Sequence, residues 1–314
     1  MEIRNLGRSG LRVSAIGLGC NNFGGRIDLE ATRRVIGKAI DLGITLFDTA
    51  DVYGERGGSE TAMGQVLGDN RKKIVLATKF GMTMSDDGSK QGGSRRWIMT
   101  AVEDSLRRLR TDWIDLYQIH RADPLTPIEE TLRALDDLIR QGKVRYVGVS
   151  NMPAWQMVEA QWTAKTCGLN PFVSFQDEFS LVVRGIEQDL MPAGRAYGMG
   201  LLPYFPLASG LLTGKYRRNA PMPANSRLTT TQRLAERYLN DTNWAISEKL
   251  IDYAEARGHT ALELAFSWLL CKPPVASVIA GATRPEQLEQ NVKAGDWKLT
   301  AAEMADIDAI TGAP

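Results

Sequence analysis

The segment TLFDTADVYG, residues 45–54, runs from a short apolar stretch into a polar loop that begins at Asp48. Seven other segments have a similar form, and stretches with helical periodicity separate them. Strands that alternate with helices along a chain are typical of parallel βα units. The eight expected strands are Ile16–Cys20, Thr45–Asp48, Val75–Lys79, Asp115–His120, Tyr146–Ser150, Ser174–Gln176, Leu201–Tyr204 and Ser277–Ala280.

The segments between these strands place apolar residues on one side of a helix. Val35 and Ala39 are four residues apart, as are Ile98 and Val102, so each pair lies on one helix face. Tryptophans at helical spacings, namely Trp155, Trp162 and Trp268, are expected to pack against the strands. Helix starts with capping-box spacing are expected at Thr126 with Glu129, Thr283 with Glu286, and Thr300 with Glu303.

Eight strands with intervening helices predict one (β/α)8 TIM barrel over residues 1–314, with extra helices towards its C-terminal end. The length of 314 residues alone fits one domain as well as two, but barrels of about 250 residues with added loops form single domains. The run Leu6–Leu11 resembles a turn, and it predicts an N-terminal β-hairpin that closes the barrel floor.

Composition argues against several classes of protein. The 38 basic and 37 acidic residues are intermixed, so neither nucleic acid nor an anionic membrane is expected as a partner. No apolar leader precedes the first strand and no apolar run is long enough to span a membrane, which predicts a cytoplasmic protein. Cys20, Cys167 and Cys271 are far apart, which favours three buried thiols over a disulfide framework or a zinc site.

Polar residues close several of the apolar strands. In α/β barrels the chemistry takes place at the carboxyl ends of the strands, so these residues are candidates for function. An aspartate at such a position is often only a helix cap, but the repetition along the chain favours a site. The polar strand ends are Asp48, Lys79, His120, Ser150, Gln176 and Tyr204.

Four residues near these ends suit the reduction of a carbonyl group. The phenol of Tyr53 has an ordinary pKa near ~10, and a neighbouring ammonium such as Lys79 is expected to lower that pKa. Asp48 would keep the lysine charged and fixed in place. His120 could donate a hydrogen bond to the oxygen that gains charge in the transition state.

With these motifs in hand, the chain resembles the aldo-keto reductases over nearly its whole length, and within them the bacterial branch that is similar to potassium-channel β-subunits. The matching segments are DTADVYG at 48–54, GGSE at 57–60, TK at 78–79, DLYQIH at 115–120 and GVSN at 148–151. The resemblance implies an enzyme that transfers hydride between a nicotinamide cofactor and a small aldehyde or ketone. It makes Tyr53 the general acid, with Lys79 and Asp48 tuning it and His120 orienting the carbonyl.

The resemblance also implies a set of cofactor contacts. Ser150, Asn151 and Gln176 would hold the nicotinamide carboxamide, and Tyr204 would stack on the ring. A loop after the seventh strand would cover the pyrophosphate, largely through backbone amides. The full expected set is Gly19, Asn21, Ser150, Asn151, Gln176, Tyr204, Pro206, Leu207, Ser209, Gly210, Leu212, Lys215, Arg227, Gly281, Thr283, Arg284, Gln287, Gln290 and Asn291, and no metal ligand is expected.

The expected cofactor is NADP(H), with NAD(H) as the alternative. The 2′-phosphate of NADPH needs cations or helix-terminal amides, and Arg284 after the eighth strand and Arg227 supply two cations. No acidic residue stands among Thr283, Arg284 and Gln287 to accept a hydrogen bond from a free ribose hydroxyl. Gln290 stands where the resemblance leads us to expect an acidic residue that reads the adenine amine.

Other functions fit less well. GLG at 17–19 lacks the third glycine of a dinucleotide fingerprint, and GLLTGK at 210–215 is one residue short of a phosphate-binding loop. A lyase that forms a Schiff base on Lys79 would need that lysine uncharged, which Asp48 opposes. A regulatory cofactor-binding subunit is a further alternative. Phe23, Phe80 and Met82 fit either a substrate pocket or barrel packing, and the loop 82–94 is expected to influence substrate range.

Overall fold

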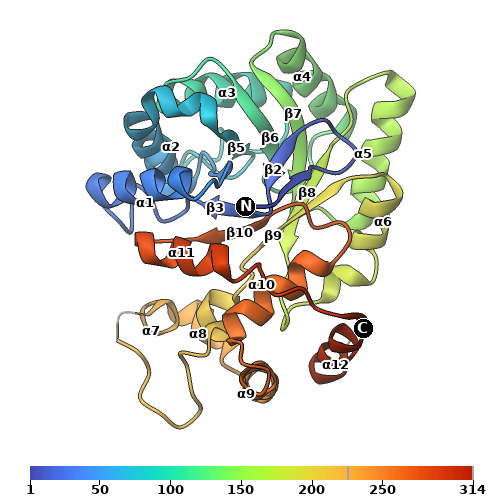
Figure 1. The fold of residues 1–314 in the computed structure, drawn as a ribbon. Helices are drawn as coiled ribbons and strands as arrows, with labels where there is room; N and C mark the ends of the chain where they lie inside the picture. Colours follow the sequence, from blue (N-terminus) through green and yellow to red (C-terminus); the bar gives the residue numbers. More distant parts are fainter. Residues whose placement is uncertain (225, 313–314) are drawn as a thin grey trace.

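The computed structural model describes residues 1–224 and 226–312 and contains a parallel barrel surrounded by helices (Figure 1). Consecutive strands pair in parallel, and the last strand returns to pair with the first. The eight strands are β3 (Ile16–Gly19), β4 (Leu46–Asp48), β5 (Val75–Phe80), β6 (Ile114–Ile119), β7 (Val144–Ser150), β8 (Ser174–Glu178), β9 (Gly200–Tyr204) and β10 (Val278–Gly281). Each predicted strand is confirmed, with ends that differ by two residues at most.

The barrel closes between β9 and the residues that precede β10. The amide of Leu201 donates to the carbonyl of Pro274 at 2.6 Å, and the amide of Ala276 donates back to the carbonyl of Leu201 at 2.9 Å. These two hydrogen bonds complete the ring, and the (β/α)8 architecture expected from the sequence is confirmed.

Helices cover the outside of the barrel. The first group follows the strands in turn: α1 (Leu29–Asp41), α2 (Tyr53–Leu67), α3 (Arg95–Leu109), α4 (Ile128–Arg140), α5 (Ala154–Cys167), α6 (Leu190–Ala196), α10 (Ala261–Cys271) and α11 (Pro285–Lys293). The additional helices are α7 (Arg227–Thr230), α8 (Gln232–Tyr238), α9 (Asp241–Glu255) and the C-terminal α12 (Ala301–Thr311). In Figure 1, α7, α8 and α9 lie together beside α10, away from α1 to α4.

The predicted N-terminal hairpin is present and closes the floor of the barrel. Its strands are β1 (Ile3–Asn5) and β2 (Arg12–Ser14), which pair antiparallel. Leu6 and Val13 are fully buried and belong to the apolar cluster inside the barrel. The open end of the barrel is therefore the opposite one, where the carboxyl ends of the strands lie.

Two of the expected capping boxes are tested by the starts of α12 and α4. Thr300 and Glu303 form the predicted box at α12. Thr126 does not cap α4: Pro127 holds the N-cap position, and the Thr126 hydroxyl donates to the carboxylate of Asp123 at 2.7 Å. A charged acceptor close in sequence competes successfully for the hydroxyl, which is why the spacing alone misled the prediction.

The expectation for the tryptophans is correct for one and wrong for two. Trp268 is fully buried, whereas Trp155 and Trp162 on α5 are 65% and 53% exposed. The buried face of α5 carries Met157 and Ala160 instead, so the tryptophans fall on the outer face. Helical spacing alone does not tell which face points inward when both faces carry apolar residues.

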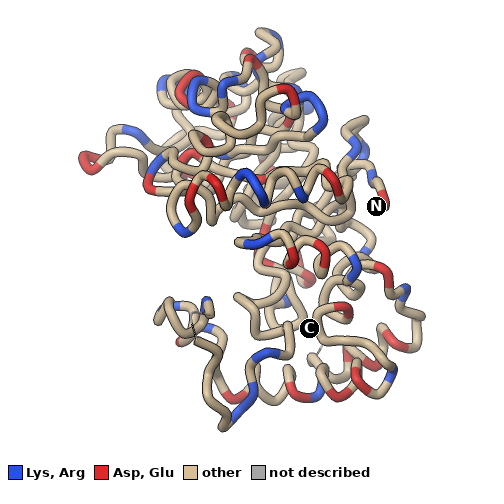
Figure 2. The backbone as a smooth tube through the Cα atoms, turned by 60° about the vertical axis from the view of Figure 1, so that its left-hand side comes forward, with Lys and Arg blue, Asp and Glu red and all other residues tan. Residues whose placement is uncertain are grey.

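Two smaller expectations are also settled. Cys20 is buried, but Cys167 is half-buried and Cys271 is exposed, so the prediction of three buried thiols is wrong for two of them. Phe23 and Phe80 are fully buried and take the packing role rather than the pocket role. Figure 2 shows Lys and Arg residues interspersed with Asp and Glu residues along the backbone. Within the described ranges, no helix is both long and apolar enough to cross a membrane.

Candidate active site

The loop after β4 brings Tyr53 to the open end of the barrel. Tyr53 begins α2, but the next four residues have positive φ, from +60° at Glu55 to +116° at Gly57. At Gly54 a side chain cannot be placed, because a Cβ there would lie 2.7 Å from the carbonyl oxygen of Phe23. Positive φ at a residue such as Glu55 costs free energy, and such strain persists where the surroundings hold it.

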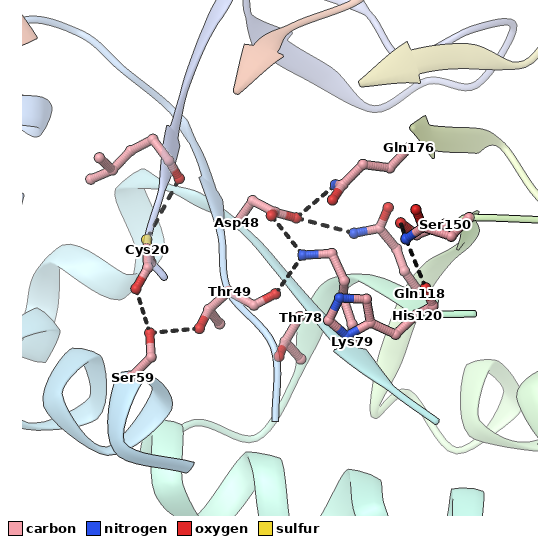
Figure 3. A network of polar contacts seen from close by, with 12 residues as sticks. Cys20, Asp48, Thr49, Ser59, Thr78, Lys79, Gln118, His120, Ser150 and Gln176 are labelled. Atoms are coloured by element: carbon pink, nitrogen blue, oxygen red, sulfur yellow. Dashed lines mark hydrogen bonds and ion pairs between the residues drawn. The ribbon is translucent and has the colours of Figure 1, made fainter. Parts of the chain in front are cut away.

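Lys79, at the end of β5, lies fully buried behind this loop. Its ammonium donates to Asp48 Oδ2 at 2.6 Å and to the carbonyl of Thr49 at 2.9 Å. The second carboxylate oxygen of Asp48 accepts from Gln176 at 2.9 Å and from Gln118 at 3.2 Å. Figure 3 shows Asp48 between the lysine and the two amides. A buried ion pair with such additional hydrogen bonds is held in one geometry.

Tyr53 and His120 lie on the cavity side of this ion pair. Their ring centres are 5.6 Å apart and the planes meet at 82°. The Lys79 ammonium lies 5.1 Å from the centre of the Tyr53 ring. The four residues expected from the sequence are therefore brought together at one barrel mouth, from the ends of three neighbouring strands, β4, β5 and β6, and the loops that follow them.

The acid–base properties of the group follow from burial. Burial disfavours the charge on Lys79, but Asp48 and Tyr53 outweigh it and raise the lysine pKa. Burial raises the pKa of Tyr53 above its ordinary value, and Lys79 offsets this only in part. The expectation that the ammonium lowers the tyrosine pKa is therefore wrong for the net shift, because desolvation is the larger effect. Burial and Lys79 lower the pKa of His120 to about 3, so its imidazole is neutral.

A cavity of about 1110 Å³ extends from this group to the start of α11. Asp48, Tyr53 and His120 line one part of it, and Lys79 lies behind Asp48. All the expected cofactor residues except one also line it. The exception is Leu212, which is 1% exposed and belongs to the apolar core. This volume slightly exceeds the usual range of about 300–1,000 Å³ for ligand pockets, so the cavity is large enough for a large ligand.

Side chains next to His120 form a linked set. Asn151 donates to Ser150 Oγ at 2.9 Å and to the carbonyl of His120 at 3.1 Å. Tyr204, at the end of β9, donates its hydroxyl to Asn151 Oδ1 at 2.7 Å. Ser150, Asn151, Gln176 and Tyr204 therefore stand side by side along the cavity wall, in the order in which their strands pair.

The other end of the cavity lies at the start of α11. Gln287 caps this helix: its Oε1 accepts from the amides of Thr283 at 2.7 Å and Arg284 at 3.2 Å. The capping box expected from Thr283 and Glu286 is therefore wrong by one position. The N-cap is Arg284, one residue later than expected, so the third helical residue is Gln287. The Arg284 side chain is exposed at the cavity rim.

Two residues of this site were not expected from the sequence. Gln118 is fully buried in β6 and donates a hydrogen bond to Asp48. Its position two residues before His120, on the same side of the strand, could have indicated that it belongs to the site. Arg26, in the loop between β3 and α1, also lines the cavity. No pattern in the sequence marks this arginine, because it lies in a loop, where neither helix nor strand periodicity assigns a residue to a face.

The barrel, its polar mouth and the long cavity define an α/β-barrel protein with an enzyme-like site at the carboxyl ends of the strands. In the described residues no group of three or more His, Cys, Asp or Glu side chains could hold a metal ion. The chain belongs to the aldo/keto reductase family, whose sequence model matches residues 15–311.

Curated relatives share most of their length with this chain. L-glyceraldehyde 3-phosphate reductase of Escherichia coli O157:H7 is 36% identical over 98% of this chain and 92% of its own. Uncharacterized oxidoreductase YrpG of Bacillus subtilis is 37% identical over 95% and 92%. A probable voltage-gated potassium channel subunit beta of Oryza sativa is 37% identical over 99% and 96%. Family and relatives together make the chain an oxidoreductase of the carbonyl-reducing kind.

Proposed function

We propose that the protein reduces aldehydes or ketones to alcohols with NADPH and uses Tyr53 as the general acid. The observation that carries the proposal is the buried Lys79–Asp48 ion pair directly behind Tyr53, with a neutral His120 beside the phenol. One point in the cavity is then surrounded by a proton donor, a cation that stabilises its conjugate base, and a neutral hydrogen-bond donor. That is the set of groups that carbonyl reduction needs.

The residues act on the carbonyl oxygen. When bound, the reduced nicotinamide supplies the hydride that reaches the carbonyl carbon. Tyr53 donates its hydroxyl proton to the oxygen, and the raised pKa of Tyr53 keeps that proton in place before the reaction. Lys79 stabilises the tyrosinate that forms, because its ammonium is held charged by Asp48. His120 donates a hydrogen bond to the same oxygen from its neutral ring.

The ring nitrogen that donates can be assigned. His120 Nδ1 is buried and has no partner in the described part of the chain. We assign the donor role to Nε2, which is the nitrogen left to face the cavity. The pKa of about 3 means that this hydrogen bond does not depend on protonation of the imidazole at neutral pH.

The wall formed by Ser150, Asn151 and Gln176 is proposed to hold the nicotinamide carboxamide. Gln176 uses its amide nitrogen on Asp48, so its oxygen is left to accept from the carboxamide. This arrangement couples the position of the cofactor to the position of Asp48. Tyr204 is proposed to stack on the ring, and its hydrogen bond to Asn151 fixes the plane of the phenol.

The preference for NADPH is assigned to Arg284. Its exposed guanidinium stands at the cavity rim, next to the first amides of α11, where an anion is favoured. The sequence also predicted that Arg227 shares the 2′-phosphate. Arg227 lines the same cavity, and we propose that it contributes the second cation.

The Schiff-base alternative is not favoured by the surroundings of Lys79. A nucleophilic lysine must lose its proton, whereas here Asp48 and the Thr49 carbonyl both accept from the ammonium. The alternative of a regulatory subunit predicts that no reduced cofactor is oxidised with any carbonyl compound, because such a subunit has no turnover.

The experiment is a panel of aldehydes and ketones, with and without phosphate or carboxylate groups, incubated with NADPH and with NADH. Phosphorylated aldehydes belong in the panel because the E. coli relative is named for one. We expect oxidation of the reduced cofactor with at least some of these compounds, and faster with NADPH. No oxidation with any compound and either cofactor would contradict the proposal.

A further inference from the structure

The two carboxylate oxygens of Asp48 have different partners. One oxygen, Oδ2, accepts from the Lys79 ammonium at 2.6 Å. The other, Oδ1, accepts from the side-chain amides of Gln176 at 2.9 Å and Gln118 at 3.2 Å, and Figure 3 shows both amides directed at it. Asp48 is only 3% exposed, so these neighbouring groups rather than bulk water hold its negative charge.

The two glutamines differ in what else they can reach. Gln176 lines the cavity, and its oxygen is proposed above to accept from the nicotinamide carboxamide. Gln118 is fully buried inside the barrel, where it pairs in register with Lys79 on the neighbouring strand, and within the described ranges it is not part of the cavity wall. Gln118 therefore reaches the reacting groups only through Asp48.

The orientation of the Gln118 amide is set by the carboxylate. Its nitrogen must face Asp48, because an amide oxygen there would be repelled. The Gln118 oxygen is then buried, without a partner in the described part of the chain. Gly148, its partner in β7, leaves room for the side chain, since a Cβ at Gly148 would lie 3.2 Å from Gln118 Cγ. An unpaired buried oxygen costs free energy that an apolar side chain would avoid, which points to the bond with Asp48 as the role of this glutamine.

That bond acts at the start of a chain of interactions. Burial disfavours the charge on Lys79, and the charge of Asp48 helps to raise the lysine pKa above its ordinary value in spite of burial. The ammonium in turn stabilises the tyrosinate that forms on Tyr53 in the proposed reduction. A buried carboxylate with fewer donors holds its charge less well, so the loss of one donor weakens each later step.

We propose that Gln118 is a positioning residue that holds Asp48 charged and oriented towards Lys79. Through this ion pair it supports the proton transfer from Tyr53 without touching substrate or cofactor. The inference rests on the proposed function and adds a residue to its mechanism. It also separates the two glutamines: loss of Gln176 should change both the chemical step and cofactor binding, whereas loss of Gln118 should change the chemical step alone.

The experiment replaces each buried glutamine with methionine, which keeps the length of the side chain and removes the donor. The variants are Gln118→Met and Gln176→Met, and Gln161→Met is the matched control. Gln161, on α5, is 6% exposed, donates to the Phe172 carbonyl at 2.9 Å and also leaves its oxygen without a partner in the described residues. Each protein is loaded with NADPH, and the single-turnover rate is measured with an aldehyde that the wild type reduces. The Kd for NADPH and the thermal midpoint are measured separately.

Gln118→Met should lower the single-turnover rate by about tenfold, the lower end of the value for a hydrogen bond to a charged group, because 3.2 Å is a long bond. Its Kd for NADPH should stay at the wild-type value. Gln176→Met should lower the rate and raise the Kd together. Gln161→Met should leave the rate and the Kd unchanged, whatever it does to the thermal midpoint.

Gln118→Glu tests the same bond with a donor that depends on pH. Next to Asp48 and Lys79, a protonated Glu at this position can donate to Asp48, whereas an ionised one repels it. The single-turnover rate of Gln118→Glu relative to wild type should therefore rise as the pH falls from about 8 to about 5. The relative rate of Gln118→Met should not change with pH. A side chain that only fills the barrel interior would give no such recovery.

Three results would overturn the inference while the wild type is active. They are a wild-type rate in Gln118→Met, a loss of NADPH affinity in Gln118→Met as large as that in Gln176→Met, and no recovery of Gln118→Glu at low pH. If the wild type itself reduces no aldehyde with NADPH, the proposed function fails, and that result is distinct because it is seen before any variant is made.

Discussion

The two ends of the cavity are built differently. At the Tyr53 end, polar side chains bond one another: Lys79 is fully buried, and Asp48 accepts from three donors. At the α11 end, Arg284 is exposed, and Gln287 caps backbone amides that a phosphate could also reach. The first end keeps its geometry through its own hydrogen bonds, whereas the second offers an exposed charge beside helix-terminal amides.

This difference implies a division of work. Fixed, mutually bonded groups suit proton transfer, where misplacement by 1 Å is costly. Exposed groups at a helix start suit recognition of the cofactor, because the binding free energy alone determines which cofactor is held. Substitutions at the Tyr53 end should therefore change the chemical step strongly, and substitutions at the α11 end should change the choice of cofactor more weakly.

The largest effect is expected for Tyr53→Phe. This variant keeps the ring and removes the proton donor, so it should bind cofactor normally and lose about 10²–10⁴-fold in kcat. The measurement is steady-state reduction of an aldehyde together with the Kd for NADPH. Activity near the wild-type value would mean that Tyr53 is not the acid.

The second effect is expected for Lys79→Met. Its loss leaves the tyrosinate unstabilised and Asp48 buried without its cation, so kcat should fall by roughly 10²-fold while the Kd for NADPH changes little. Thermal unfolding should shift to lower temperature, because an unpaired buried carboxylate is costly. If the cofactor Kd changes and kcat does not, the assigned role is wrong.

The pH profile gives the third comparison. Since the pKa of His120 is about 3, kcat/KM for reduction should show no inflection near the ordinary imidazole value of 6.5. Since the pKa of Tyr53 is raised, the acid stays protonated through neutrality, and the rate should fall only on the alkaline side, where the phenol ionises. A rise or fall centred near 6.5 would show that His120 titrates in the active enzyme.

The smallest effect is expected at the α11 end. Arg284→Ala should lower the ratio of kcat/KM with NADPH to that with NADH by about tenfold, because one charge-assisted contact with the 2′-phosphate is lost. The NADH value serves as the internal control. Equal losses with both cofactors would show that Arg284 does not read the phosphate.

The sequence predicted the barrel well because its signals repeat. Each strand is an apolar run, and six of the eight end in a polar residue, among them Asp48, Lys79 and His120, so the same edge of the sheet is marked repeatedly. The candidate catalytic residues could be named from their positions at this edge, without knowing any distance between them.

Other features depend on contacts that spacing does not encode. The positive φ of Glu55 and Arg56 is imposed by packing of the neighbouring glycines, so no local residue preference reveals it. The net pKa shift of Tyr53 depends on burial, which the sequence does not state. Arg26 reaches the cavity from a loop that no sequence pattern marks.

The central claim is that hydride passes from the cofactor to a carbonyl carbon at the Tyr53 end of the cavity. The direct measurement uses NADPH carrying deuterium on one or the other face of the nicotinamide C4, with an aldehyde that the enzyme turns over. We predict alcohol with one deuterium on the former carbonyl carbon, from one face only, and almost no alcohol with Tyr53→Phe. Alcohol without deuterium from either face, or equal transfer from both, would contradict the account.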